Sequence, residues 1–287
     1  MRKALFTLNV GNYAPRIREL TYPLFRYFCR RRGYEFVEMT ADEFPEWPKV
    51  YQKLQIYRIA HEMGVDFAWF LDADTLLHPD CPDFQPLLPP HTVANNGHDF
   101  GAFRWRNDQY FERDGRYIGT CGWNTMAPAS CFDVWRPCDD LTLEQVMDNM
   151  QPLVCEHNPA PNPKLPRECQ AIISTGHLAD DYVVSRNIAR FGLKYTTLAD
   201  IVKERCPGAQ LFWHEYQISE EEKVNRMLHV ILDPRTWNIP PQLMGWNMEE
   251  YARHRRQLEA YHEELMRRDA MAVAQPELQQ RGFVPAQ

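Results

Sequence analysis

FAWFLDAD, residues 67–74, is a stretch in which a continuous apolar run meets two acidic residues, Asp72 and Asp74. Apolar runs of this length are typical of strands that are buried on both faces of a parallel sheet. In open α/β sheets, ligands bind at the carboxyl ends of the strands. The sequence therefore predicts a buried strand over 67–71 and a functional site at Asp72 and Asp74.

The segments before this strand predict the repeating unit of a parallel sheet. Residues 4–10 form an apolar run typical of a strand, and residues 16–32 carry apolar side chains at helical spacing. A second short strand is expected over 35–39, and a second helix over 49–63. The chain thus opens with a β-loop-α-β pattern, which builds parallel sheets.

The second half of the chain predicts a mixed set of shorter elements. Strands are expected over 100–105, 119–126, 211–213 and 227–232, helices over 141–150 and 180–191, and loops over 78–98 and 152–168. We therefore expect an α/β fold with a mixed, mainly parallel, Rossmann-like sheet flanked by helices.

The C-terminal part has a different character. Residues from about 247 to 272 are charged with a helical pattern, and a polar tail follows. We expect one α/β domain over 1–245 and a C-terminal helix and tail over 246–287.

Composition argues against several classes of protein. The 287 residues carry a net charge of −7, which does not favour nucleic acid as a partner. No stretch approaches the ~20 apolar residues of a transmembrane helix. The eight cysteines include no C-x-x-C pair, so a zinc ribbon is not expected. We expect a cytoplasmic protein with mostly reduced thiols.

Asp72 and Asp74 are spaced so that both carboxylates can reach one ion. Oxygen ligands of this kind suit Mg²⁺ or Mn²⁺. Such an ion can bridge two phosphates and neutralise a departing nucleoside diphosphate. The alternative is an exposed turn with two solvated aspartates, because a D-x-D triplet also occurs by chance. The position directly after a buried strand favours the metal site.

The segment from Tyr51 to Phe84 resembles the glycogenin-like family 8 retaining glycosyltransferases. The shared features are a Lys-Leu helix, the D-x-D after the strand, and an acidic-aromatic loop. The resemblance implies a GT-A fold and a metal-dependent, hexosyltransferase-like enzyme that uses Mn²⁺ or Mg²⁺. Such an enzyme moves a sugar, with retention, from a nucleotide-diphosphate sugar to a glycan or other acceptor. A UDP-sugar is the favoured donor and a GDP-sugar the alternative.

The same resemblance implies contacts with the donor. Thr7, Leu8 and Asn9 match a Thr-Leu strand of the family, and Tyr13 matches a Tyr-Ala loop. In the family these segments hold the nucleotide base and ribose.

The resemblance also places three residues in or near the D-x-D at the nucleotide-sugar donor. Asp72 and Ala73 would contact the donor, and Lys53 lies on the Lys-Leu helix that packs near it in the family. The alternative for Lys53 is an ordinary surface lysine.

A third match lies far downstream. In the family, a metal-binding His is followed by Gly at +3, Lys at +6 and Trp at +8, whereas here His229 is followed by Leu232, Arg235 and Trp237. The resemblance implies that His229 is the third ligand of the D-x-D ion. It also implies that Arg235 grips the diphosphate, since arginine keeps the charge in a forked geometry. Leu232 departs from the pattern, and His214 is the reserve candidate for the ligand.

Two weaker matches suggest residues near the transferred sugar. Asn124, in a segment similar to the family's Phe-Asn-Ser-Gly-Val strand, would touch the sugar or the diphosphate region. Asp180 and Asp181 resemble the Asp-Gln pair of the family, whose Asp sits beside the sugar. The alternative for this pair is an N-terminal helix cap, where Asp is favoured.

Other functions remain open from the sequence. Family 34 galactosyl- and xylosyltransferases have similar Asp-x-Asp strands. A nucleotidyltransferase or a nucleotide-sugar hydrolase could also use a strand-end carboxylate pair. A pyrophosphorylase is expected to have a Gly-rich phosphate loop near the first strand, where this chain has only Gly11. A non-catalytic scaffold that binds a sugar nucleotide is the third alternative.

Overall fold

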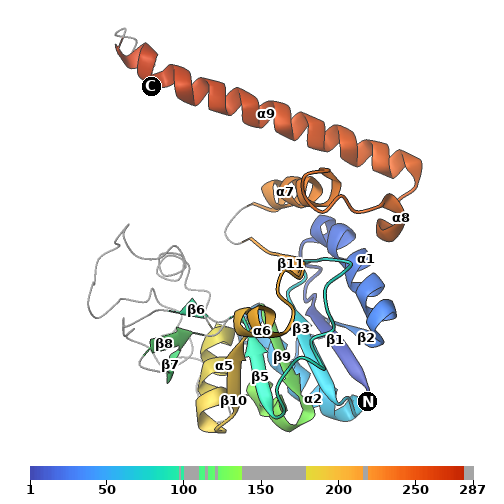
Figure 1. The fold of residues 1–287 in the computed structure, drawn as a ribbon, viewed down its shortest axis with the longest axis vertical. Coiled ribbons are helices and arrows are strands. Elements are labelled where there is room, and N and C mark those ends of the chain that lie inside the picture. The colour runs from blue at the N-terminus through green and yellow to red at the C-terminus, as the bar shows by residue number, and fades with distance from the viewer. Residues whose placement is uncertain are drawn as a thin grey trace.

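A computed structural model describes residues 1–96, 98–99, 110–113, 116–119, 122–137, 179–215 and 219–280. A six-stranded sheet lies at the centre, in the order β10-β5-β9-β3-β1-β2 (Figure 1). Its strands are β1 (Lys3–Leu8), β2 (Tyr34–Met39), β3 (Phe67–Leu71), β5 (Thr92–Asn95), β9 (Asn124–Pro128) and β10 (Lys194–Thr197). Only β9 is antiparallel to its neighbours, so the other five strands run in one direction.

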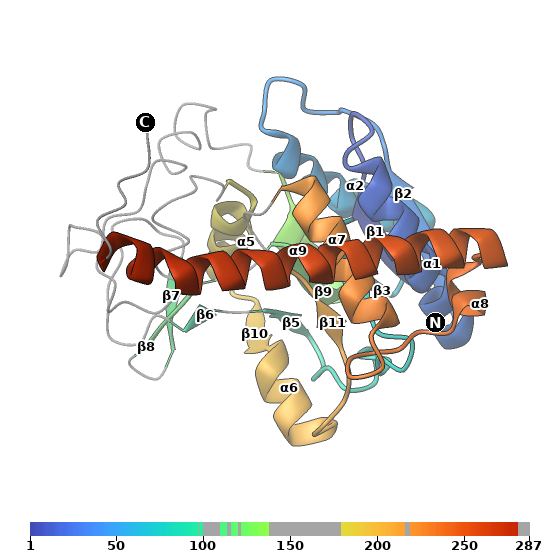
Figure 2. The same ribbon diagram turned by 90° about the horizontal axis from the view of Figure 1, so that it is seen from above.

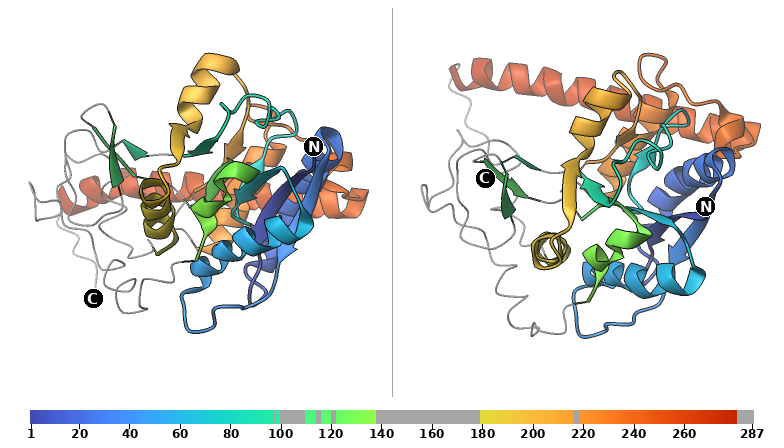
Figure 3. Two further views of the ribbon diagram at one scale, coloured as in Figure 1. Left: turned by 90° about the horizontal axis from the view of Figure 1, so that it is seen from below. Right: turned by 60° about the horizontal axis from the view of Figure 1, so that its bottom comes forward.

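Helices cover both faces of this sheet (Figure 3). One face packs on α1 (Pro15–Arg32) and α6 (Leu198–Arg205). The other packs on η1 (Lys49–Leu54), α2 (Gln55–Met63), η2 (Ala129–Trp135) and α5 (Ala179–Arg190). The alternation of β3 explains why its whole run is apolar: Ala68 and Phe70 face one layer, and Trp69 and Leu71 face the other.

The other strands of the described residues form two small sheets. β4 (Leu76–Leu77) pairs antiparallel with β11 (Phe212–Trp213) just beyond the end of β3. β6 (His98–Asp99), β7 (Tyr110–Arg113) and β8 (Arg116–Gly119) form a three-stranded sheet. The β4–β11 pair brings a segment from residue 212 onward next to the chain that leaves β3.

The C-terminal helices form a further layer beyond α1. They are α7 (Glu220–Leu232), α8 (Pro241–Met244) and the long α9 (Met248–Gln280), which lies across α7 when seen from above (Figure 2). Leu258 of α9 is buried in an apolar cluster with residues of α1, α7 and α8. Gln257 donates a hydrogen bond to Asn225 (2.8 Å), and Tyr261 donates one to Glu222 (2.8 Å). No helix among the described residues is long and apolar enough to cross a membrane.

The predicted α/β fold class is confirmed, with a mainly parallel sheet flanked by helices and a C-terminal helix. The elements from β1 to β3 lie where the sequence predicts them, because each has a strong periodic pattern and α1 and α2 end at Gly33 and Gly64, with φ of 70° and 60°. The described thiols of Cys29, Cys81, Cys131 and Cys206 are free. The domain boundary after 245 stays a prediction.

Two predictions in the second half are wrong. Residues 78–98 were expected to be a loop but contain β5, a central strand whose two apolar residues are too few for a clear pattern. Residues 227–232 were expected to be a strand but belong to α7. There the apolar residues at 224, 227, 228 and 231 recur at helical spacing, and the side chain of Ser219 caps the helix by accepting from Glu222 N.

Other predicted elements have a mixed outcome. α5 and β11 agree with the predictions, and β10 and α6 were not predicted. The strand expected over 119–126 begins only at Asn124, and α9 extends beyond the expected 272 to Gln280. The expected elements over 100–105, 141–150 and 152–168 lie outside the described residues.

Candidate functional site

The backbone of the D-x-D segment is held from two sides. The N–H of Asp72 donates to the carbonyl of Trp123 (2.9 Å), and the N–H of Thr75 donates to the carbonyl of Asp72 (3.1 Å). The Thr21 hydroxyl of α1 donates to the carbonyl of Ala73 (2.7 Å). Because β9 is antiparallel to β3, the start of β9 lies at the carboxyl end of β3. The two aspartates therefore project from a rigid sheet edge.

His214 is brought to Asp74 by the β4–β11 pair. Trp213 lies opposite Leu76 in that pair. Because the two strands are antiparallel, His214 follows Trp213 toward the D-x-D turn, which comes just before Leu76. Its Nε2 lies 3.2 Å from Oδ1 of Asp74. Its ring stacks on Trp123, with ring centroids 4.4 Å apart and planes 9° apart. The histidine is thus fixed in orientation by a strand pair and an aromatic face.

Each aspartate also meets a buried lysine. Lys53 Nζ lies 3.1 Å from Oδ1 of Asp72, and Lys223 Nζ lies 2.6 Å from Oδ2 of Asp74. Burial by itself raises the pKa of Asp74, but the hydrogen bond and charge of His214, together with Lys223, hold that pKa below its ordinary value. The side chain of Asp72 is 27% exposed, so this carboxylate is open to an approaching ion or ligand.

Tyr13 lies next to the same carboxylates. Burial and the negative charges of Asp74 and Asp72 raise the pKa of its phenol. The preceding loop has positive φ at Gly11 (73°) and Asn12 (57°). Backbone conformations of this kind concentrate at functional sites.

Arg18 of α1 holds this loop in place. Its Nε donates to the carbonyl of Tyr13 (2.8 Å), and its Nη2 donates to the side chain of Asn12. Its Nη1 bonds Glu38 (3.3 Å), which also accepts from Asn9. The loop that carries Tyr13 is therefore tied to β2, beside the D-x-D.

The side chains at this edge have the composition of a divalent-metal site. One ligand atom from each of Asp72, Asp74 and His214 can be chosen so that all three lie within 4.8 Å of one another. Ligands of an octahedral ion about 2.1 Å from the metal fall within this separation. Two carboxylates and one imidazole are donors that Mn²⁺ accepts, and Mg²⁺ prefers the oxygens.

His229 and Arg235 lie in a different group. His229 is near the end of α7, and its ligand atom groups with those of Asp233 and His262. The side chain of Arg235 is 82% exposed and bonds Asp233 through Nε (3.0 Å) and Nη2 (2.8 Å). His214 reaches the D-x-D and His229 does not, because β11 pairs with β4 next to the D-x-D, whereas residues 227–232 belong to helix α7.

The remaining predicted donor residues are mostly buried. Thr7 is fully buried, Leu8 is partly buried in the core, and Asn9 is buried with its amide donated to Glu38. Asn124 is fully buried, accepts from the Trp69 indole (2.7 Å) and donates to Asn96 (3.1 Å). The structure thus gives Asn124 a role in holding β3 and β9, and its contact with a sugar stays a prediction.

Asp180 and Asp181 lie at the start of α5, and their side chains lie outside the described part of the structure. Their predicted place beside the sugar stays a prediction.

Sequence reasoning missed Lys223, Trp123 and Arg18 as parts of this site. Lys223 follows three glutamates, a pattern typical of a solvated helix face, yet its side chain is buried against Asp74. No local signal could have found it. Trp123 stacks on His214, a contact that no local pattern of residues predicts.

A scan against protein-family models finds no match, and a search of curated protein sequences finds none. One similar solved structure is a glycosyltransferase involved in the glycosylation of the major capsid of PBCV-1. It is 14% identical with a TM-score of 0.39, and the likeness covers 79% of this chain and 98% of that chain.

Two further solved structures are similar. A197 from STIV is 13% identical with a TM-score of 0.37, over 77% of this chain and 87% of that one. A putative glucose-1-phosphate thymidylyltransferase from Bacillus anthracis, in complex with a sucrose, is 12% identical with a TM-score of 0.30, over 68% and 87%.

Proposed function

We propose that the chain is a metal-dependent glycosyltransferase of the GT-A type, which binds the diphosphate of a nucleotide-sugar donor at the carboxyl end of β3. The observation that carries the proposal is the grouping of Asp72, Asp74 and His214 within 4.8 Å at that edge. Two buried lysines adjoin the same carboxylates. Carboxylates, imidazole and ammonium groups together suit a metal-bound diphosphate.

In this proposal His214, rather than His229, is the third ligand of a Mn²⁺ or Mg²⁺ ion. When bound, the ion supplies positive charge that bridges the two phosphates and stabilises the departing nucleoside diphosphate. Asp72 and Asp74 would hold it from the D-x-D turn. Trp123 would keep the His214 ring in one orientation, as the outer partners of metal-binding histidines do.

Lys53 and Lys223 would contribute to charge balance. A divalent ion and two ammonium groups offset two carboxylates and the two phosphodiester charges of a sugar nucleotide. Lys223 therefore takes the place that the sequence resemblance gave to Arg235, because it lies at Asp74 and Arg235 lies at Asp233. In a buried setting such charges act more strongly than at an exposed surface.

The donor and the stereochemistry rest on the resemblance to family 8. It supports a UDP-sugar, with the loop of Tyr13 near the nucleotide, and a reaction with retention. It also supports Asp180 and Asn124 on the sugar side of the site. A nucleotidyltransferase could use the same strand-end carboxylates, so the products of the reaction must separate the two.

The first test is a thermal-shift panel of nucleoside diphosphates with and without Mn²⁺. A ligand that binds only the folded state raises the midpoint. We expect UDP to raise it only when Mn²⁺ is present, and Asp74→Asn to remove the shift. Asp80→Asn is the matched control, because that aspartate is exposed and pairs with Arg31 instead. If no nucleoside diphosphate shifts the midpoint, with or without Mn²⁺, the proposal fails.

Product analysis then identifies the reaction. A glycosyltransferase incubated with the donor and an acceptor panel releases a nucleoside diphosphate and forms a glycoside. A nucleotidyltransferase would instead consume a nucleoside triphosphate and a sugar phosphate and release pyrophosphate. The second outcome would be compatible with the proposed metal site but would contradict the proposed glycosyltransferase activity.

A further inference from the structure

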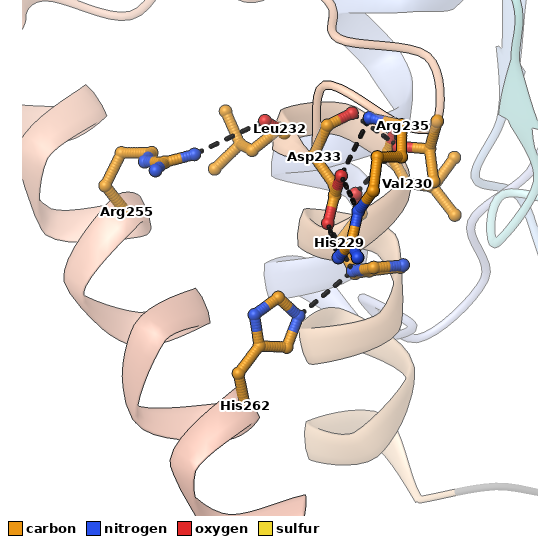
Figure 4. Close-up of polar contacts among 8 residues, drawn as sticks. His229, Val230, Leu232, Asp233, Arg235, Arg255 and His262 are labelled. Carbon is orange, nitrogen blue, oxygen red and sulfur yellow. Dashed lines mark hydrogen bonds and ion pairs between the residues drawn. The ribbon is translucent and has the colours of Figure 1, made fainter.

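Two histidines and an aspartate meet at the contact between α7 and α9 (Figure 4), and they form a group distinct from Asp72, Asp74 and His214. His229 comes from the last turn of α7, Asp233 is the residue that follows this helix, and His262 projects from α9. His229 Nδ1 lies 3.0 Å from His262 Nε2 and 3.6 Å from Asp233 Oδ2. Residues far apart in the sequence thus turn three ligand atoms toward one point.

The separations fit a small tetrahedral ion. Nitrogen and oxygen ligands that lie about 2.1 Å from a tetrahedral zinc ion are about 3.4 Å from each other. The two measured separations, 3.0 and 3.6 Å, lie on either side of that value. Two imidazoles and one carboxylate are a donor set that suits Zn²⁺ and similar transition metals better than Mg²⁺.

The carboxylate is held in place by groups outside the cluster. The backbone N–H of Arg235 donates to Asp233 Oδ1 (2.8 Å), and the guanidinium bonds both carboxylate oxygens. Partners of this kind orient metal ligands and are part of working sites.

We propose that His229, Asp233 and His262 bind a transition-metal ion of the Zn²⁺ class, which fastens α9 to α7. Without the ion, the two helices are joined here by a hydrogen bond between the two imidazoles, in which one ring nitrogen donates and the other accepts. Binding replaces this bond by two metal–nitrogen bonds. The ring that donated loses its proton at the ligating nitrogen and takes one from solvent at its other nitrogen, so both imidazoles stay neutral. A water molecule completes the tetrahedron, since three protein ligands leave one position open.

The consequence is a cross-link between the C-terminal helix and the body of the protein. α9 also contacts α7 through Leu258 and through hydrogen bonds of Gln257, Tyr261 and Arg255, whose guanidinium donates to the carbonyl of Leu232 (3.4 Å). A metal that binds only the docked arrangement shifts α9 toward it by mass action. The site is separate from the D-x-D group and does not depend on the proposed transferase activity.

The test is hydrogen exchange of the full-length protein after treatment with a chelator, with and without Zn²⁺. In the wild type we expect Zn²⁺, but not Mg²⁺, to slow exchange of the amides around residues 254–266 by at least about tenfold. His262→Gln and His229→Gln should each remove this effect. His91→Asn is the matched control: it removes an exposed histidine elsewhere, at a positive φ (55°) that asparagine tolerates.

A second arm separates the two metal sites. Asp74→Asn should keep the protection of α9 by Zn²⁺, because Asp74 belongs to the other group. Equal protection in His262→Gln and the wild type would overturn the proposal. So would the absence of any protection in the wild type, whatever the folding of the variants.

Discussion

Asp72, Asp74 and His214 on one side, and His229, Asp233 and His262 on the other, are both small groups of carboxylates and imidazoles, yet they are held in different ways. The first group projects from strand ends whose backbone is bonded to β9 and α1. The second depends on the docking of one helix on another. The difference indicates that the first group is as rigid as the sheet, whereas the second can form and separate with α9.

Counter-charges differ in the same way. Asp74 meets Lys223, and both side chains are about nine-tenths buried. Asp233 meets Arg235, whose side chain is 82% exposed. Buried pairs are costly to break, because the remaining charge stays out of water, whereas an exposed partner returns to solvent.

The largest expected effect is on stability and follows from this contrast. Asp74→Ala leaves Lys223 buried without its partner and should lower the free energy of unfolding by about 3–5 kcal/mol. Asp233→Ala should lower it clearly less, since Arg235 becomes solvated. Urea denaturation with a chelator present measures both variants. A larger loss for Asp233→Ala would reverse the comparison between the two groups.

The second expected effect sharpens the assignment of the metal ligands. His214→Gln should weaken Mn²⁺-dependent binding of UDP at least about tenfold, because it removes one of the three ligands of the proposed metal site. His229→Gln should leave that affinity unchanged, since its ligand atom groups with Asp233 and His262. Titration calorimetry of UDP at fixed Mn²⁺ gives both values. The opposite pattern would return the third ligand to His229, as the sequence resemblance implies.

The smallest expected effect concerns pH and the docking of α9. Burial and the charge of Arg253 lower the pKa of His254, which packs on Trp246. The unfolded chain therefore binds more protons than the folded one below about pH 6.5, and stability is lost as pH falls through the pKa of the folded state. His254→Phe keeps the ring contact without the charge.

Unfolding curves from pH 8 to pH 5, without metal, check this prediction. The wild type should lose stability on acidification more steeply than His254→Phe, with little difference at pH 8. Arg16, Glu19 and Arg253 line the same hollow as His254. Equal slopes for the two proteins would mean that His254 does not contribute.

The predictions from sequence agree with the structure where an element is specified by residues close together in the chain. β3, its two acidic residues, α1 and α2 are specified by local patterns of apolar residues and by glycines that end helices. β5 has too few apolar residues to be recognised. The run of residues 227–232 is short and apolar, and periodicity alone cannot separate a strand from a buried helix segment in such a run.

By itself, the sequence determined that this protein has a buried parallel strand followed directly by Asp72 and Asp74, because the hydrophobic run and the acidic residues are adjacent in the chain. Only the tertiary structure decided that His214 and Lys223 reach Asp74 and that His229 meets His262. Those contacts depend on the pairing of β4 with β11 and on the docking of α7 and α9. Such pairings join segments far apart in the chain, and local residue patterns do not encode which segments meet.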